Sequence, residues 1–192
     1  PALTITEEQR QAMCDDAIKL AKHVNYRSAG TVEFLVDKHG SHYFIEMNPR
    51  IQVEHTVSEM VTGIDIVQSQ ILIAEGYPLD SDEVGIPNQD AVVPRGAAIQ
   101  CRITTEDPTN AFAPDTGKIE FYATGSGNGI RLDGGNGFTG AVITPYYDSL
   151  LVKITSFGRN FDVAASRAVR ALGELKIKGV KDRKSTRLNS SH

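Results

Sequence analysis

The chain has 192 residues, of which 20 are Lys or Arg, 24 are Asp or Glu, and 40% are hydrophobic. This composition excludes a disordered chain and supplies enough apolar residues for a core in one domain or two small ones. The formal net charge of −4 excludes a sequence-wide positive field for nucleic acid or anionic lipid, and no apolar run approaches the roughly 18 residues that span a bilayer. We therefore expect a globular protein with no nucleic acid and no membrane among its partners.

Two features favour a cytoplasmic location. Residues 1–10 contain no basic stretch followed by an apolar one, so no secretory signal is visible. Cys14 and Cys101 are far apart and lie in apolar patterns, which argues against a disulfide framework or a zinc site. The sequence does not begin with Met, and we expect the true start to lie upstream.

The first half of the chain predicts helices combined with a β-hairpin. Apolar residues recur at helical spacing over residues 7–24, directly after a capping-box pattern at Thr6–Gln9. Residues 31–37 and 42–48 each alternate between apolar and polar side chains, and turn-forming residues separate them. This segment therefore predicts one amphipathic helix followed by an antiparallel hairpin.

Two shorter helices are expected after the hairpin. Thr56 and Glu59 form a second capping-box pattern, ahead of a helix that runs to Gly63. Asp65 is the predicted N-cap of a further apolar helix, which stops at Gly76.

A polar, Pro-rich stretch at 79–94 predicts a boundary between two domains, which we place at 1–90 and 91–181. Beyond the boundary, short β-runs separated by Gly-rich turns precede a final helix capped by Asn160. The fold class is therefore α+β, with a mostly antiparallel second half and one packed helix. Residues 182–192 are expected to be disordered, either as a translated sequencing adapter or as a natural flexible C-terminus.

Two Gly-rich segments, Gly125–Gly129 and Gly134–Gly137, resemble phosphate-binding loops only in composition. Neither is followed by Gly-Lys-Ser/Thr, and neither opens a helix. We interpret both as hairpin turns.

The predicted hairpin places two carboxylates opposite each other. If its loop is centred between His39 and Gly40, Glu33 pairs directly with Glu46, and Asn48 projects from the same face. Directly paired side chains have Cβ atoms roughly 4.5–5.5 Å apart, where two carboxylates repel. Two carboxylates and an amide oxygen are hard ligands suited to Mg²⁺ or Mn²⁺ together with nucleotide phosphates.

A second interpretation of the same face is a solvated sheet surface whose acidic side chains never meet. The predicted register places Leu35 and Phe44 on the face of Glu33, which favours partial burial. The residues alone leave both interpretations open.

Polar side chains also crowd the loop after Pro49, a common location for functional groups. Arg50 can form a fork with a carboxylate-like anion, and Glu54 can act as a general base. An ordinary charged surface loop is the alternative.

The ten residues 46–55, EMNPRIQVEH, resemble the biotin carboxylase signature of the biotin-dependent carboxylases, which belong to the ATP-grasp superfamily. Flanking blocks that are also similar to the family lie at 29–37, 44–76, 101–108, 114–119 and 144–154. The resemblance extends over residues 1–181. It implies the C-terminal part of an ATP-grasp domain over 1–90 and a biotin carboxylase C-terminal domain over 91–181.

Within this family, residues 103–119 and 131–151 are most similar to the branch that carboxylates pyruvate to oxaloacetate, a reaction of gluconeogenesis. The corresponding blocks of acetyl-CoA carboxylase subunits usually read INAEDP and GYxVPPYYDSM. A biotin carboxylase subunit of acetyl-CoA carboxylase is one alternative. A non-catalytic binding module that retains the metal hairpin is another.

The resemblance implies a role for each residue that matches a family motif. The matching metal ligands, which hold divalent ions that bridge the ATP phosphates, are Glu33, Glu46 and Asn48. The matching bicarbonate site consists of Arg50, Gln52 and, through its backbone, Val53. Glu54 matches the general base that deprotonates bicarbonate, and Arg131 matches the arginine beside biotin that stabilises the developing enolate.

The implied reaction has two stages. Bicarbonate attacks the γ-phosphoryl group of MgATP to form carboxyphosphate, which releases carbon dioxide beside biotin, and carboxybiotin then carries the carboxyl group to its acceptor. In the family, the Gly-rich lid and the phosphate-binding lysines precede the matching region, and the carboxyl-transfer domain and the biotin carrier domain follow it. We therefore expect this chain to be part of a longer, homo-oligomeric enzyme and to be inactive alone.

Overall fold

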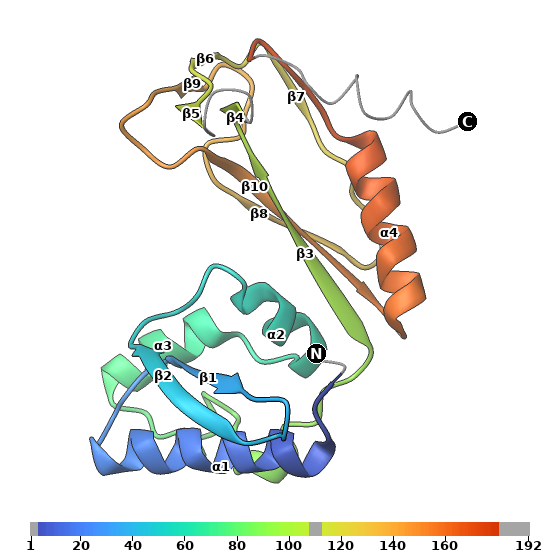
Figure 1. The fold of residues 1–192 in the computed structure, drawn as a ribbon. Helices are drawn as coiled ribbons and strands as arrows, with labels where there is room; N and C mark the ends of the chain where they lie inside the picture. Colours follow the sequence, from blue (N-terminus) through green and yellow to red (C-terminus); the bar gives the residue numbers. More distant parts are fainter. Residues whose placement is uncertain (1–3, 108–112, 181–192) are drawn as a thin grey trace. The chain divides into compact units, whose positions relative to one another are not determined.

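The computed structural model describes residues 4–107 and 113–180 (Figure 1). The predicted tail at 182–192 lies outside the described residues.

The chain divides into two compact units. Among the described residues, the first unit consists of 4–55 and 63–93, and the second consists of 56–62, 94–107 and 113–180. The predicted domain boundary at 90/91 lies close to the division between Val93 and Pro94. Nothing in the sequence indicated that residues 56–62 would group with the later part of the chain.

Local signals set the helices of the first unit, which are α1 (Glu7–His23), α3 (Ile66–Glu75) and the 3₁₀ turn η1 (Gln89–Ala91). At the start of α1, Thr6 Oγ1 accepts from the Gln9 backbone N–H, and the Gln9 side chain accepts from the Thr6 backbone N–H. The Asp65 side chain caps α3 by accepting from the Gln68 N–H, and α3 ends at Gly76, whose φ is 105°. The predicted caps of both helices are therefore confirmed.

Strands β1 (Thr31–Val36) and β2 (His42–Asn48) form the hairpin of the first unit (Figure 1). They pair as predicted at the open end of the hairpin but not near its turn. Glu33 pairs with Glu46, whereas Phe34 pairs with Phe44. The residue left over in β2 forms a bulge that shifts the register by one. The predicted loop centre between His39 and Gly40 was therefore wrong, because Phe34–Phe44 and Val36–His42 pair about His39. Gly40, in the five-residue connection 37–41, takes a positive φ of 87°.

The bulge also corrects the predicted faces of the hairpin. The Phe44 ring lies beside Phe34, with centroids 6.4 Å apart in an edge arrangement, and therefore on the opposite face from Leu35. On the Phe34 face, His42 Nε2 lies 2.8 Å from Asp16 Oδ2 of α1. The face of Glu33 is not lined by Phe44 and is open.

Helix α2 (His55–Thr62) begins earlier than predicted, so Thr56 lies inside the helix and is not its N-cap. The Thr-x-x-Glu spacing of a capping box also places two side chains on one helix face. Here Thr56 and Glu59 are buried, and both bond to the sheet of the second unit. The capping-box interpretation of this pair was therefore wrong.

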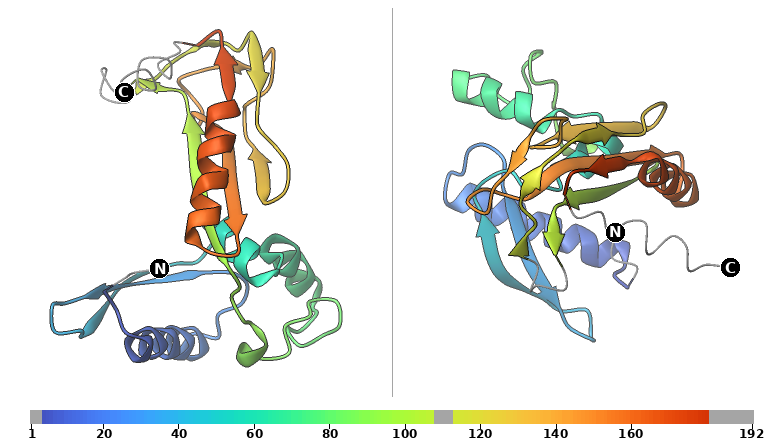
Figure 2. Two further views of the ribbon diagram at one scale, coloured as in Figure 1. Left: turned by 90° about the vertical axis from the view of Figure 1, so that its right-hand side faces the viewer. Right: turned by 90° about the horizontal axis from the view of Figure 1, so that it is seen from above.

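The second unit is built on a three-stranded antiparallel sheet in the order β3 (Ala97–Thr104), β10 (Leu150–Gly158) and β8 (Ile130–Gly134). Helix α4 (Phe161–Glu174) lies along one face of this sheet (Figure 2) and is capped by Asn160, as predicted. Val152 and Ile154 of β10 form a core cluster with Ala171 and Leu175.

Three short strand pairs complete the second unit. They are β4 (Glu106–Asp107) with β5 (Ala113–Pro114), β6 (Gly117–Lys118) with β9 (Val142–Ile143), and β7 (Phe121–Ala123) with β11 (Lys176–Lys178). Ile119, between β6 and β7, is fully buried in a second cluster with Ala141, Ile143 and Leu151.

Neither Gly-rich segment forms a hairpin turn, because the strands on its two sides belong to different sheets. Gly134–Gly137 bonds instead to β10, where Leu151 O accepts from the N–H groups of Gly135 and Gly137. In Gly125–Gly129, a Cβ atom on Gly129 would lie 2.6 Å from the Phe157 carbonyl oxygen. The glycines permit close approach of backbone to backbone, and the hairpin-turn interpretation was wrong for both segments.

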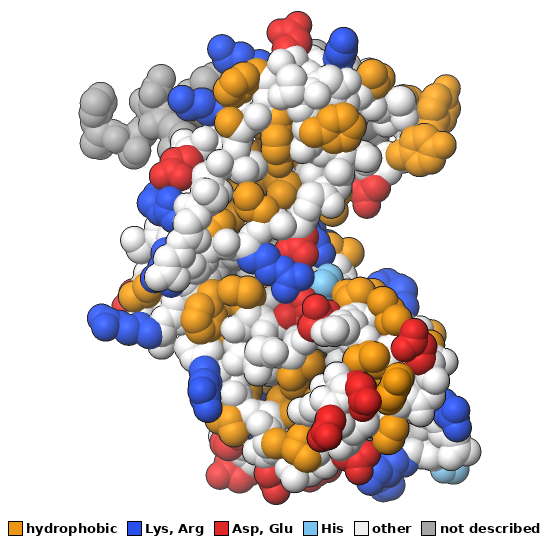
Figure 3. Space-filling model, turned by 180° about the vertical axis from the view of Figure 1, so that it is seen from behind, with side chains coloured by type: hydrophobic (Ala, Val, Ile, Leu, Met, Phe, Trp, Pro, Cys, Tyr) orange, Lys and Arg blue, Asp and Glu red, His pale blue; other side chains and the backbone are white. Residues whose placement is uncertain are grey.

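The surface mixes charged and apolar side chains. On the face drawn in Figure 3, acidic and basic groups are interspersed, and hydrophobic side chains reach the surface of both units. Within residues 4–107 and 113–180, no helix is both long enough and apolar enough to cross a membrane.

Candidate functional site

The open face of the hairpin brings together the three predicted metal ligands. Glu33 and Glu46 are cross-strand partners, and the Asn48 Nδ2 group donates to Glu33 Oε1 at 2.9 Å and to Glu46 Oε1 at 3.3 Å. The two Oε1 atoms therefore lie no farther apart than the sum of these distances, about 6 Å. Separations beyond roughly 8 Å would prevent a single octahedral ion or a close ion pair from being shared.

The chemistry of this hairpin cluster, defined as Glu33, Glu46 and Asn48, fits a divalent cation. The NH₂ group of Asn48 lies where a cation would lie, since it donates to the carboxylates of both Glu33 and Glu46. Rotation of the Asn48 amide would present its oxygen, a hard ligand, in the same direction. Mg²⁺ usually keeps several water or phosphate oxygens, so three protein ligands suit it.

The hairpin cluster is not a closed protein cage. No group of three or more His, Cys, Asp or Glu side chains among the described residues could hold a metal ion by itself. Oxygens from water or from a bound phosphate would therefore complete the coordination shell.

The loop after β2 places two of its predicted anion-binding side chains in contact. Arg50 Nη1 donates to Gln52 Oε1 at 3.1 Å and to the Ile51 carbonyl at 3.2 Å. Val53 and Glu54 follow on the exposed side of the loop. A guanidinium beside an amide can hold a small planar oxyanion, with the Glu54 carboxylate close in sequence.

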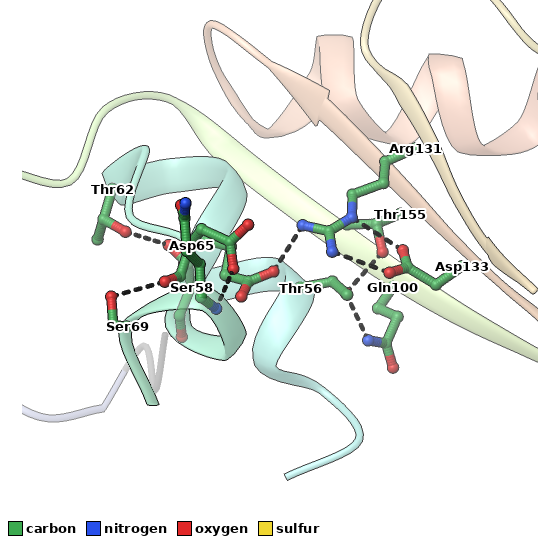
Figure 4. A network of polar contacts seen from close by, with 11 residues as sticks. Thr56, Ser58, Thr62, Asp65, Ser69, Gln100, Arg131, Asp133 and Thr155 are labelled. Carbon is green, nitrogen blue, oxygen red and sulfur yellow. Dashed lines mark hydrogen bonds and ion pairs between the residues drawn. The ribbon is translucent and has the colours of Figure 1, made fainter. Parts of the chain in front are cut away.

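In the second unit, Arg131 of β8 is held by two carboxylates (Figure 4). Its Nε and Nη2 groups form a fork with Asp133, at 2.9 and 2.8 Å, and its Nη1 group donates to Glu59 Oε2 at 2.6 Å. The Arg131 side chain is 33% exposed, whereas that of Glu59 is 5% exposed. The hydrogen bonds to Asp133 raise the pKa of Arg131; burial opposes the rise, and the bond to Glu59 adds to it. Arg131 therefore stays cationic.

Arg131 belongs to a row of polar side chains that crosses the sheet. Thr155 of β10 pairs with Gln100 of β3 on one side and with Arg131 of β8 on the other. Thr56 Oγ1 of α2 lies 2.7 Å from Thr155 Oγ1 and accepts from Gln100 Nε2 at 2.6 Å. Thr56 and Glu59, one helical turn apart, thus attach α2 to this row (Figure 4).

Sequence reasoning found Arg131 only through the family resemblance and missed the residues that hold it. Asp133 had a signal, because side chains two residues apart share one face of a strand. Glu59 also had a signal, since its spacing from Thr56 places both side chains on one helix face, but this spacing was interpreted as a capping box. Gln100 and Thr155 had none, since their contact depends on the pairing of distant strands.

Two family models match the chain. The model described as carbamoyl-phosphate synthase L chain, ATP binding domain, matches residues 1–82, and the biotin carboxylase C-terminal domain model matches residues 100–188. Together with the antiparallel sheets and packed helices, these matches confirm the predicted α+β fold class.

Individual relatives agree with the family models. The chain is 59% identical over 181 residues to a pyruvate carboxylase from Aspergillus terreus, a match that covers 94% of this chain and 15% of that protein. The chain therefore spans less than a fifth of the length of this curated relative.

Solved structures show the same likeness. A Rhizobium etli pyruvate carboxylase variant with the allosteric activator acetyl coenzyme A is 53% identical, with a TM-score of 0.88 over 94% of this chain and 18% of that one. The biotin carboxylase domain dimer of Hydrogenobacter thermophilus 2-oxoglutarate carboxylase, in complex with MgADP, ADP and bicarbonate, is 46% identical. Its TM-score is 0.85, over 94% of this chain and 38% of that one.

Proposed function

Because this chain belongs to the biotin-dependent carboxylases, we propose that it supplies the metal, bicarbonate and biotin-facing residues of a biotin carboxylase domain. The observation that carries the proposal is the hairpin cluster, in which Asn48 lies between the paired carboxylates of Glu33 and Glu46. The sequence pattern and the strand register lead to this cluster independently of the family resemblance.

The hairpin cluster holds Mg²⁺ or Mn²⁺ in this proposal. When bound there with ATP, the ion neutralises phosphate charge during phosphoryl transfer. The MgADP in the complex of the 46%-identical 2-oxoglutarate carboxylase domain supports Mg²⁺ as the first choice. The protein's own contribution is to hold two carboxylates on paired strands, so that they need not be brought together when the nucleotide binds.

The loop after β2 binds and activates bicarbonate in this proposal. Arg50 and Gln52, which already contact each other, orient the anion with their N–H donors, and the backbone of Val53 completes the site. The Glu54 carboxylate accepts the proton from the bicarbonate hydroxyl and so increases the nucleophilicity of the attacking oxygen.

Arg131 acts on biotin in this proposal. Its guanidinium is fixed by Asp133 and Glu59 and stays charged, so it offers preorganised positive charge to an oxygen on which negative charge develops during carboxylation. A fixed charge of this kind lowers the barrier because it need not reorganise when the reaction occurs.

For the whole protein, we propose carboxyl transfer to pyruvate with biotin on a carrier domain. The 59% identity to a pyruvate carboxylase supports pyruvate over 2-oxoglutarate, for which the matching domain is 46% identical. Homo-oligomeric assembly and a cytoplasmic location stay predictions within this proposal.

The experiment uses a full-length pyruvate carboxylase whose matching segment is replaced by residues 1–181 of this chain. Glu46→Gln should abolish bicarbonate-dependent ATP cleavage, since it removes one ligand charge while keeping the side-chain shape. The matched control is Glu83→Gln, which changes an exposed loop carboxylate of the same unit and should leave the rate unchanged. Retention of more than half of the ATP cleavage by Glu46→Gln would contradict the metal assignment.

A further inference from the structure

Arg131 is held by side chains from two separate elements of the second unit. Asp133 lies two residues away on the same strand, whereas Glu59 comes from α2, 72 residues earlier in the chain. A single fork would allow the guanidinium to move with β8 alone. The third bond, from Nη1 to Glu59, ties it to the helix as well.

The three hydrogen bonds also determine which N–H groups of Arg131 remain available to a ligand. A guanidinium has five N–H groups, and Asp133 and Glu59 accept from three of them. The other two, one on Nη1 and one on Nη2, have no partner among the described residues, and the Arg131 side chain is one-third exposed. The carboxylates thus orient the two remaining donors and fix the plane in which they lie.

Glu59 is itself held firmly. Its side chain is 5% exposed, and one turn earlier on α2 the fully buried Thr56 bonds to Thr155 and receives a bond from Gln100. Gln100, Thr155 and Arg131 are neighbours across the sheet, so α2 is attached at both ends of one row. The position of Glu59 relative to Arg131 is therefore set by four elements and not by one flexible side chain.

We propose that Glu59 and Asp133 are positioning residues for biotin carboxylation, which hold the Arg131 guanidinium so that its two remaining N–H groups face the reacting oxygen. The proposal rests on the assigned role of Arg131 at biotin. A misplacement of about 1 Å in such a group can lower a rate by about 10²-fold, so loss of one of the two anchors of Arg131 has a measurable effect.

The test measures two activities of the full-length chimaeric carboxylase described above, which are carboxylation of free biotin and bicarbonate-dependent ATP cleavage without biotin. Glu59→Ala should lower kcat for biotin carboxylation about 10- to 100-fold and ATP cleavage by a much smaller factor. Glu59→Gln should recover the biotin rate to within about 3-fold of the parent, because its amide oxygen can still accept from Nη1.

The matched control is Glu174→Gln, which alters another Arg–Glu contact of the second unit, the exposed pair with Arg170. It should change neither activity. If Glu59→Ala does not fold, Glu59→Asp replaces it, since this variant keeps the charge but withdraws the carboxylate by one methylene. It should lower the biotin rate about 3- to 10-fold, again with a smaller change in ATP cleavage.

Arg131→Ala separates this inference from the proposed function. If Arg131→Ala selectively lowers biotin carboxylation but the Glu59 variants lower both activities equally, or neither, the positioning role is refuted and the function of Arg131 stands. If Arg131→Ala leaves biotin carboxylation unchanged, the assignment of Arg131 fails, and the inference fails with it.

Discussion

The two units differ in how they are stabilised. Within the described residues, every buried hydrophobic side chain belongs to the second unit, from Ile119 to Leu175, where two clusters form around β10. Helices α1 and α3 of the first unit contain no buried residue, and the Leu35, Tyr43 and Phe44 side chains of its hairpin are more than half exposed. The first unit is therefore organised mainly by caps, turns and strand pairing, whereas the second is organised by its core.

Well-formed local structure and high stability are therefore separate properties. Caps and hairpin turns contribute about 1 kcal/mol each, whereas burial of one large aliphatic side chain contributes roughly 1.5–3 kcal/mol. The candidate metal site lies in the unit with less burial, and Arg131 lies in the unit with more.

Hydrogen exchange should show the largest difference between the units. We expect backbone amides of β10 and α4 to exchange on the order of 10³-fold more slowly than those of α1 and the hairpin, because opening of the second unit exposes its core. Exchange of the whole chain, followed by NMR or mass spectrometry, measures both units in one sample. Equal protection in the two units would refute the comparison.

The two units should also differ in function, because biotin carboxylation is assigned to Arg131 of the second unit and ATP cleavage to residues of the first. In the chimaeric carboxylase, Arg131→Ala in the second unit should slow biotin carboxylation by about 10²–10³-fold, the scale expected for loss of one preorganised donor. Bicarbonate-dependent ATP cleavage should fall less, because that step is assigned to residues of the first unit. Steady-state rates of both reactions provide the measurement, and an equal loss of both would reject the assignment.

The features that the sequence predicted correctly are those that depend on neighbouring residues. Thr6, Asp65 and Asn160 were found as caps because each helix start depends on a few neighbouring residues. The Glu33–Glu46 pairing was also found, although the assumed loop was wrong, because the bulge in β2 restores the predicted register beyond Phe44. Signals of this kind lie within a few residues of the structure that they determine.

Contacts between distant segments could not be predicted in this way. The spacing of Thr56 and Glu59 fits both a capping box and a buried helix face, and only the position of the sheet decides between them. The Gly-rich segments were misinterpreted for the same reason, since the strands that they connect pair with other strands. The pairing of Glu33 with Glu46 was therefore predictable from the residues alone, whereas the contact of Glu59 with Arg131 was not.

A pair of glycine substitutions should show how packing differs between the units. Gly129 and Gly85 both have positive φ values, 77° and 71°, but a Cβ atom on Gly129 would lie 2.6 Å from the Phe157 carbonyl, whereas nothing lies within 4 Å at Gly85. Gly129→Ala should destabilise the second unit by about 2–4 kcal/mol, and Gly85→Ala should cost the first unit only the backbone strain of about 1 kcal/mol. Denaturant unfolding measures both, and equal costs would show that the close approach at Gly129 is unimportant.

The smallest expected effect is a slower alkylation of Cys101 than of an exposed thiol. Burial raises the pKa of the Cys101 thiol in β3, so less of it is thiolate at pH 8 than in an ordinary exposed thiol. Its alkylation by iodoacetamide should be several-fold slower than that of N-acetylcysteine at pH 8, and the ratio should narrow as the pH rises through the raised pKa. Mass spectrometry of the Cys14 and Cys101 peptides separates the two sites. A Cys101 rate equal to that of the model thiol at pH 8 would contradict the effect of burial.

The most direct test of the central claim is a titration of this chain with Mn²⁺, followed by paramagnetic broadening of its amide signals. Three protein ligands predict weak binding, on the order of 1 mM, with the signals of Glu33, Glu46 and Asn48 broadened first. Glu46→Gln should remove this selective broadening, and Glu83→Gln should preserve it. Broadening that begins elsewhere, or that persists unchanged in Glu46→Gln, would contradict the assignment of the hairpin cluster as the metal site.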